Sequence, residues 1–143
     1  MTTITIWDDP ESDYVEFHVG KATPAHMEEV EPDIFERHDE KTEQVRGCGI
    51  FSIRKRANVP GIVGKPVERQ IDLGGELCNY DGRRDVFHVR LSESRPSKTV
   101  TLMNGISVEL SGGALTGIWI ERMSRMLTRN ERRQLLLAEE IPA

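Results

Sequence analysis

The chain of 143 residues is long enough to bury the core of one domain, or to form two very small units in tandem. With 37% hydrophobic and 6% aromatic residues it has enough large side chains for a folded core, which excludes bulk disorder. Its net charge of -5 argues against a general nucleic-acid binder, because such proteins are usually basic.

The two cysteines, Cys48 and Cys78, belong to no CxxC metal motif and no disulfide framework. We therefore expect two buried free thiols and a reducing compartment. The first residues have neither a basic start nor an apolar signal core, and no window approaches the roughly 18 apolar residues of a membrane span. These features predict a cytoplasmic protein without a membrane segment.

Alternating apolar and polar residues predict strands in the first half of the chain. Residues 3–7 and 14–19 flank an acidic turn at residues 8–12, a pattern that predicts a β-hairpin. Residues 34–38 and 45–53 are further strand candidates, and Pro24 after Thr23 is suited to the start of one helical turn at residues 23–26. Residues 54–65 have the prolines and glycines of a connector, and a short strand is expected at residues 67–73.

The strand pattern restarts at residues 77–80, where Asp81-Gly82 predicts a hairpin turn before a strand at residues 86–91. After a polar loop, residues 100–103 and 106–110 flank a second turn at Asn104-Gly105. Residues 115–120 are apolar and prone to form a strand.

One feature of this pattern occurs twice: two aspartates four residues apart around a turn, followed by an alternating strand. The first copy has Asp9 and Asp13, and the second has Asp81 and Asp85, 72 residues later. A shift of 70 residues instead superposes Phe-His-Val at residues 17–19 on residues 87–89. The same shift superposes Val30 on Val100, Gly47 on Gly117 and Ile50 on Ile120. Both shifts are even and keep each residue on the same strand face, so the sequence predicts a duplicated β unit whose copies share a core.

The C-terminal segment differs in kind from both copies. Thr-Arg-Asn-Glu at residues 128–131 is a capping box, which predicts a helix from there to about Glu139 with an apolar patch at residues 135–137. The first copy has no counterpart to this helix. It is therefore an appendage that covers a sheet edge, docks on the core or binds a partner.

The motif Tyr80-Asp81-x-x-x-Asp85-x-Phe87, followed by Leu115-x-Gly117-Ile118-x-Ile120, resembles the small bacterial and archaeal family called domain of unknown function 2283. The resemblance covers roughly residues 77–121, and the first copy matches more loosely, with Asp8 at the tyrosine position. It implies a small antiparallel β domain and no established catalytic residue. Single-domain members often sit beside small toxin-like genes, which implies an antitoxin-like role. A double copy with a C-terminal helix departs from the typical member.

The acidic turn invites a calcium interpretation, because Asp9, Glu11 and Asp13 have the first spacings of an EF-hand loop. However, Tyr14 and Gly20 stand where that loop needs a glycine and a bidentate glutamate. We expect a solvated turn and keep the three carboxylates as weak metal candidates. Residues 61–66 approach a phosphate-binding loop, but their final proline prevents the required helix start, so no cofactor is predicted.

His18 and His88 coincide in the 70-residue alignment, and paired histidines can bind a metal or transfer protons. Neither has a serine or cysteine nucleophile nearby in a recognisable arrangement, and duplication alone would copy a structural histidine. A structural role is therefore favoured. His26 and His38 carry less signal, because His38 opens a charged turn.

Arginines and a tryptophan cluster around the start of the C-terminal helix. These predicted partner-binding residues are Trp119, Arg122, Arg125, Arg129, Arg132 and Arg133. Exposed tryptophan and arginine favour interfaces, so the cluster predicts a surface for an acidic partner or nucleic acid. The alternatives are a solvated helix face for the arginines and a core position for Trp119.

Together these features predict an α+β, mainly β fold of two similar antiparallel units in tandem plus a C-terminal helix. The expected division is a first repeat at residues 1–58, a connector at 59–69, a second repeat at 70–123 and a helical appendage at 124–143. The predicted function is non-enzymatic protein binding or regulation, as an adaptor or antitoxin-like protein. The alternative is a metal-binding protein or hydrolase that uses His18 and His88 with nearby carboxylates. Another protein is the expected partner rather than nucleic acid, and exposed sheet edges also favour a homodimer.

Overall fold

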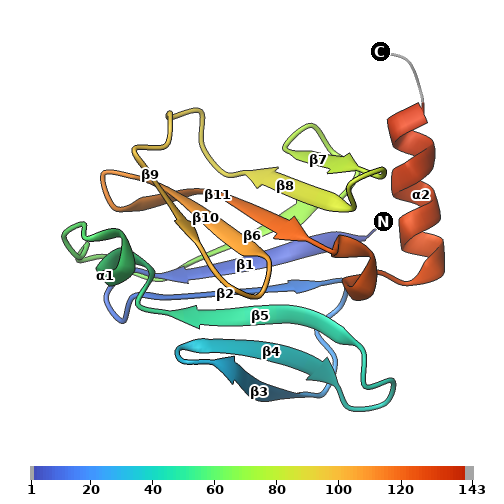
Figure 1. Ribbon diagram of the computed structural model, residues 1–143, viewed down its shortest axis with the longest axis horizontal. Coiled ribbons are helices and arrows are strands. Elements are labelled where there is room, and N and C mark those ends of the chain that lie inside the picture. The colour runs from blue at the N-terminus through green and yellow to red at the C-terminus, as the bar shows by residue number, and fades with distance from the viewer. Residues whose placement is uncertain (1, 141–143) are drawn as a thin grey trace.

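The computed structural model describes residues 2–140, which form two antiparallel sheets and a C-terminal helix (Figure 1). The first sheet has the strand order β3-β4-β5-β2-β1-β6. Its strands are β1 (Thr3–Asp9), β2 (Tyr14–Val19), β3 (Ala25–Glu31), β4 (Ile34–Asp39), β5 (Val45–Phe51) and β6 (Val67–Asp72). A short helix, α1 (Ile53–Ala57), follows β5.

The second sheet has the order β7-β8-β11-β10-β9. Its strands are β7 (Cys78–Asp81), β8 (Val86–Arg90), β9 (Lys98–Thr101), β10 (Ile106–Ser111) and β11 (Ala114–Glu121). When β7–β11 are matched with β1–β5 in chain order, the two sheets have the same strand order, and β6 is an added strand beside β1. The predicted α+β fold of two similar units in tandem is confirmed. The chain then forms a 3-10 helix, η1 (Met123–Met126), and the C-terminal helix α2 (Arg129–Glu140).

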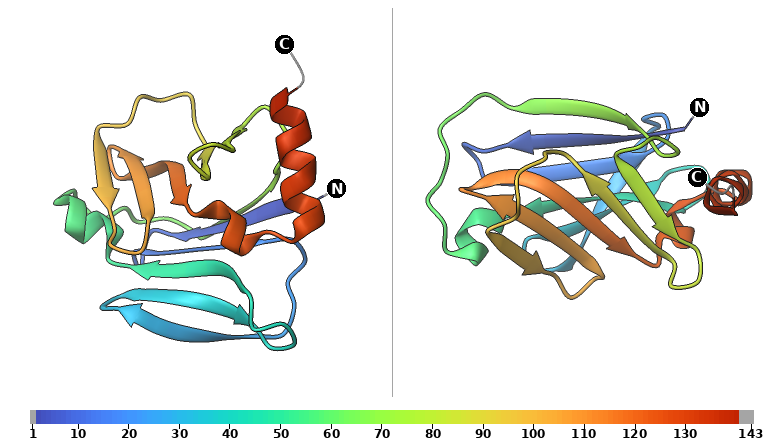
Figure 2. Two further views of the ribbon diagram at one scale, coloured as in Figure 1. Left: turned by 45° about the vertical axis from the view of Figure 1, so that its right-hand side comes forward. Right: turned by 90° about the horizontal axis from the view of Figure 1, so that it is seen from above.

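The two sheets lie one over the other and share one apolar core (Figure 2). In β2, Val15, Phe17 and Val19 are at most 1% exposed, and in β8 Phe87 and Val89 are fully buried. Alternation along a strand sends every second side chain to one face, so these residues point inward and their polar neighbours outward. Burying each such side chain contributes roughly 1.5–3 kcal/mol, which determines the inner face of both strands.

In each unit the hairpin turn ends on an aspartate that caps a helix formed much later in the chain. Asp13 and Asp85 both have left-handed backbones, with φ of 52° and 57°, a conformation that aspartate tolerates better than most residues. The Asp13 carboxylate accepts hydrogen bonds from the backbone N–H groups of Arg54 (3.1 Å) and Lys55 (3.2 Å) in α1. The Asp85 carboxylate accepts one from the N–H of Ser124 (2.9 Å) in η1. The repeated Asp-x-x-x-Asp turn is therefore a structural cap.

The strand register corrects the predicted equivalence of His18 and His88. Both strands begin directly after the left-handed aspartate, so the third residue of β2, Glu16, matches the third residue of β8, His88. The partner strand agrees with this match, because Val15 pairs with Ile50 and the equivalent Phe87 pairs with Ile120. The units are offset by 72 residues at β2 and by 70 at β5, since the second unit is two residues shorter between these strands. The coincidence of the two histidines in the 70-residue alignment was thus misleading.

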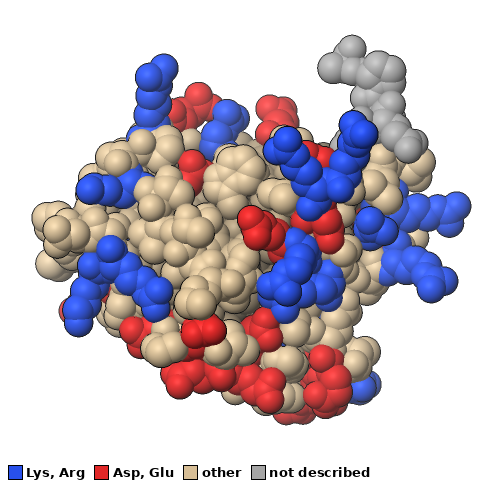
Figure 3. All heavy atoms as spheres, viewed as in Figure 1, with Lys and Arg blue, Asp and Glu red and all other residues tan. Residues whose placement is uncertain are grey.

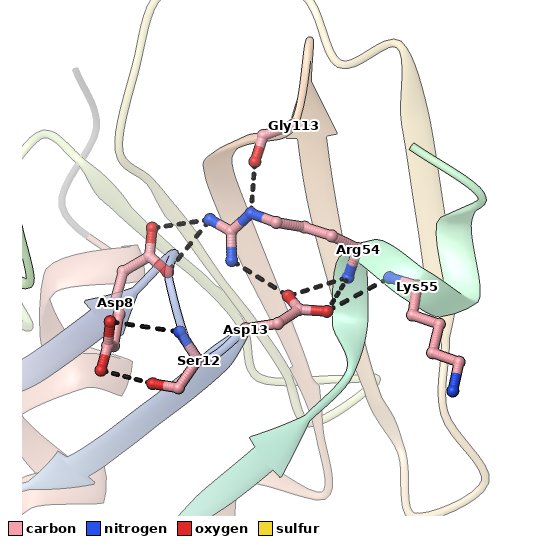
Figure 4. Close-up of polar contacts among 7 residues, drawn as sticks. Asp8, Ser12, Asp13, Arg54, Lys55 and Gly113 are labelled. Carbon is pink, nitrogen blue, oxygen red and sulfur yellow. Dashed lines mark hydrogen bonds and ion pairs between the residues drawn. The ribbon is translucent and has the colours of Figure 1, made fainter. Parts of the chain in front are cut away.

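Arg54 links the two units at the ends of their sheets (Figure 4). Its side chain is 1% exposed, and its Nη2 lies 2.9 and 3.1 Å from the two oxygens of Asp8. Its Nη1 donates to Asp13 Oδ1 at 3.2 Å, and its Nε donates to the carbonyl of Gly113 at 2.6 Å, in the turn between β10 and β11. Every guanidinium nitrogen has an acceptor, as a buried cation requires. Burial raises the pKa of Asp8, although the charge of Arg54 opposes the shift.

Three local expectations differ from the structure. Residues 23–26 form no helical turn, because Ala25 and His26 begin β3 and pair with β4. Residues 53–57 form α1, so the beginning of the predicted 54–65 connector is helical. The predicted boundary between connector and second repeat falls inside β6, which pairs with β1 as the outer strand of the first sheet.

Replacing Arg54 with methionine should destabilise the protein by about 3–5 kcal/mol, because two carboxylates would remain partly buried without their cation. Urea unfolding followed by circular dichroism measures this change in the free energy of unfolding. The matched control is Lys55→Met, since the Lys55 side chain is exposed and points away from the cluster (Figure 4). The control should change stability by no more than about 0.5 kcal/mol. A loss below about 1 kcal/mol for Arg54→Met would contradict a linking role.

Candidate functional site

The helix α2 begins with the predicted capping box. The backbone N–H of Glu131 donates to Thr128 Oγ1 at 3.2 Å, and Glu131 Oε1 accepts from the N–H of Thr128 at 2.8 Å. This reciprocal pair satisfies two N–H groups that have no partner within the helix. The start of α2 is therefore fixed by its own sequence.

Two residues of the first unit hold the same helix start from outside. Arg46 of β5 donates to both oxygens of Glu131, at 2.7 and 3.1 Å, and to the carbonyl of Met126 at 2.7 Å. Gln44 Nε2 donates to the carbonyl of Leu127 at 2.9 Å. Burial would raise the pKa of Glu131, but the hydrogen bonds and charge of Arg46 outweigh it and lower this pKa. The helix that only the second unit possesses is thus tied to the first unit.

Packing against β7 sets the direction of α2. Leu135 is 6% exposed in the core, Leu136 packs against the core, and Leu137 is exposed. Near the β7–β8 turn, the hydroxyl of Tyr80 donates to Asp85 Oδ1 at 2.6 Å, and Arg132 Nε lies 3.5 Å from the same hydroxyl. Of the three roles left open for this helix, the structure shows that it packs against an edge strand of the second sheet.

Four of the predicted partner-binding arginines form an exposed basic surface. Their side chains lie on or just before η1 and α2, and none of them forms an ion pair with the residues that the structure describes. We call Arg122, Arg129, Arg132 and Arg133 the arginine surface. Figure 3 shows basic groups on the side of the molecule where α2 lies, and acidic groups along the edge formed by β3 and β4.

The other two predicted residues have different surroundings. Arg125 Nη1 lies 2.7 Å from Glu36 Oε2, and its side chain is 26% exposed, so its charge is partly neutralised by the first unit. Trp119 lies on the outer face of β11 rather than in the core, with 39% of its surface exposed. Its ring stacks on the His88 imidazole at a centroid distance of 4.0 Å.

His18 and His88 do not share a site. Their strands direct Phe17 and Phe87 into the common core, so the two imidazoles point away from it on different sheets. His88 Nε2 contacts Glu109 Oε1 at 2.7 Å, and a Cβ at Gly117 would lie 2.3 Å from that same oxygen. The glycine therefore makes room for this pair on the outer face of the second sheet.

The first sheet has an equivalent pair of opposite polarity. Arg37 Nη1 lies 3.5 Å from Glu16 Oε1, and Arg37 pairs in register with Gly47, just as Glu109 pairs with Gly117. His88 thus takes the place of Glu16 in a repeated cross-strand contact, which is a structural role.

His18 lines a polar cleft of about 470 Å³ on the first sheet, together with Arg46, Glu68 and Glu131. Burial lowers the pKa of His18, and the charge of Arg37 adds to the shift. The His18 imidazole therefore stays neutral down to a lower pH than a solvated histidine does.

The acidic turn does not assemble the weak metal candidates. The carboxylate of Asp9 accepts a hydrogen bond from the hydroxyl of Ser12 at 2.5 Å. The carboxylate of Asp13 accepts one from Arg54, and Glu11 is exposed. Asp13 is therefore occupied by cationic and N–H donors rather than open to a cation.

Both cysteines are free thiols, but only Cys48 is fully buried as predicted, whereas Cys78 is partly exposed. Burial raises the pKa of each to about 12. They are therefore poor nucleophiles.

Among residues 2–140, no helix is long and apolar enough to cross a membrane. Comparisons with protein-family models, characterised proteins and solved structures found no match to this chain. The resemblance to domain of unknown function 2283 thus stays a prediction.

Replacing Glu131 with glutamine should destabilise the protein by about 1–2 kcal/mol at pH 7, because the charged hydrogen bonds to Arg46 are lost. The folded pKa of Glu131 is lowered, so its contribution is present above the ordinary pKa of 4.5 and disappears as pH falls through the folded value. Urea unfolding of the wild type and of Glu131→Gln, at pH 7 and below pH 4, measures the free energy of unfolding of each. The difference between the two proteins should be smaller in acid than at pH 7. Glu93→Gln is the control, since that side chain is 92% exposed. A difference that does not change with pH would contradict this role.

Proposed function

We propose that this chain is a non-enzymatic binding protein whose arginine surface recognises an acidic segment of another protein. The observation that carries the proposal is the pair of exposed guanidinium groups of Arg129 and Arg133, which form no ion pair with the residues that the structure describes. Beside them, Arg132 is also exposed, and its guanidinium contacts the hydroxyl of Tyr80. Residues 122–133 contain five arginines and one glutamate in a chain whose net charge is -5. The basic character is thus local.

Helix stability does not explain these arginines. Arg129, Arg132 and Arg133 occupy the first five positions of α2, where the positive end of the helix dipole disfavours cations. Arg129 and Arg133 are also four residues apart, a spacing at which like charges destabilise a helix by roughly 0.2–0.5 kcal/mol. A bound carboxylate would relieve both effects, and the dipole itself would favour it.

The anchoring of α2 supports a recognition role. Its start is held by the capping box and by Arg46, so the arginines project from a fixed element. Preorganised side chains lose less conformational freedom on binding, which raises affinity. Arginine also pairs with carboxylates through two parallel hydrogen bonds, which gives directional selectivity.

An acidic protein segment fits better than nucleic acid. Residues 28–43 contain eight acidic residues, with Arg37 and Lys41 the two basic ones. Such a surface would repel a long polyanion, whereas a short acidic segment can contact the arginines alone. The alternative of a metal site or hydrolase at His18 and His88 has less support, because these residues lie on different sheets. A homodimer through exposed sheet edges remains a prediction from the sequence.

Charge reversal tests the proposal. The full chain, with Arg129→Glu/Arg133→Glu as the variant, is used to capture partners from native cell extract, and the affinity of the captured protein is then measured by calorimetry. The variant should bind at least tenfold more weakly, because two charge pairs are replaced by repulsion.

The matched control is Arg95→Glu/Lys98→Glu, which makes the same charge change at two exposed residues. Arg95 lies in the loop after β8, and Lys98 is the first residue of β9. It should bind within twofold of the wild type. Equal affinities for both variants would contradict the arginine surface as the binding site. Loss of the captured partner after nuclease treatment would contradict a protein partner.

A further inference from the structure

A cluster of metal-ligating side chains lies on the hairpin of β3 and β4, outside the arginine surface. His26 and His38 are direct partners in the antiparallel register, and their rings stack at a centroid distance of 5.3 Å. Glu43 follows in the turn between β4 and β5. One ring nitrogen from each histidine and one oxygen of Glu43 lie within 4.8 Å of one another. Among the side chains that the structure describes, this is the one group of three or more histidine, cysteine or acidic residues whose donor atoms lie this close together.

The donor atoms suit a divalent transition-metal ion. Imidazole nitrogens and a carboxylate oxygen bind zinc at about 2.0–2.2 Å in a tetrahedron, which places the donors about 3.3 Å apart. To bind zinc, the distance between any two of the three donor atoms must therefore shorten by no more than about 1.5 Å. His26 and Glu43 are exposed and can rotate toward His38 without a shift of the strands.

The turn that carries Glu43 is organised without a metal. The carboxylate of Asp39 accepts hydrogen bonds from the hydroxyl of Thr23 at 2.6 Å and from the N–H groups of Thr42 and Lys41 at 3.0 and 2.8 Å. These bonds lower the pKa of Asp39 to about 2. The N–H of Glu43 donates to the carbonyl of Asp39 at 2.9 Å, so the turn holds Glu43 beside the histidine pair.

The surroundings of His38 give a second, independent indication. Its Nε2 is buried and makes no aligned hydrogen bond with any described residue, yet it lies 2.9 Å from Glu28 Oε2 and 3.6 Å from Glu36 Oε1. Carboxylates around a ring nitrogen either join the metal shell or orient a metal-bound imidazole. The acidic residues of this edge (Figure 3) also attract a cation.

We propose that His26, His38 and Glu43 bind one zinc ion, or a divalent ion of similar chemistry. Glu28 completes the site, and Glu36, whose other carboxylate oxygen is paired with Arg125, helps to orient His38. Imidazole ligands favour zinc, copper and nickel over calcium and magnesium. The site shares no residue with the arginine surface, so either proposal can fail while the other holds.

Calorimetric titration of the full chain without an affinity tag, using zinc chloride, tests the site. The wild type should bind one zinc per chain, and His26→Ala and Glu43→Ala should each weaken binding at least tenfold. Circular dichroism checks the fold of both variants, which alter exposed side chains. Zinc should also raise the melting temperature of the wild type but not of His26→Ala, because a ligand that binds the native state stabilises it.

Matched controls are His18→Ala and His88→Ala, which remove histidines from the outer faces of the two sheets. Both should bind zinc within twofold of the wild type, as should Arg129→Glu/Arg133→Glu. Absence of saturable binding by the wild type would overturn the site, and so would unchanged binding by His26→Ala. Loss of zinc binding in the His18 or His88 control would place the metal elsewhere.

Discussion

The fold depends on an aspartate at the end of a tight turn that caps a helix about 40 residues later. Asp13 caps α1, and Asp85 caps η1, in each case by accepting backbone N–H groups that no helical carbonyl can reach. This contact closes each unit, because it joins the first hairpin to the element that follows the unit's fifth strand. Asp13, which invites a metal interpretation in the sequence, is thus a structural group whose partners lie far along the chain.

The two units complete this contact with different chemistry. In the first, the carboxylates of Asp8 and Asp13 share the buried guanidinium of Arg54, which also reaches Gly113 of the second unit. In the second, Tyr80 takes the place of Asp8, and Ser124 takes the place of Arg54. The Arg54 contact joins the two units. The Asp85–Ser124 contact stays within the second unit, where η1 continues into α2. The arginine surface therefore exists where the copies have diverged.

The sequence predicted those parts of the fold that depend on local patterns. Alternation identified β2, β8 and β10, and the capping box identified the start of α2. It missed β3, because that strand is exposed along nearly its whole length and has no alternation to detect. Without β3 the pairing of His26 with His38 could not be foreseen, since their 12-residue separation has meaning only in a hairpin.

Long-range contacts were equally hidden. Arg54 is the first residue of the 54–65 segment that the sequence predicts as a connector, and nothing in that pattern indicates burial. Its burial follows from three acceptors supplied by two different units. The arginines around the start of α2 were identifiable because they cluster in the sequence, but Arg125 could not be separated from the rest until its contact with Glu36 was visible. The internal repeat was detectable, although the two-residue difference between the units produced a false match of histidines.

Amide hydrogen exchange tests the central claim that each aspartate holds the helix of its own unit. Glycine tolerates the left-handed backbone, so Asp13→Gly and Asp85→Gly remove the carboxylates without adding strain. The predicted result is faster exchange in α1 alone for Asp13→Gly, and in η1 and the start of α2 alone for Asp85→Gly. Unchanged exchange in these helices, or the same pattern in both variants, would contradict the claim.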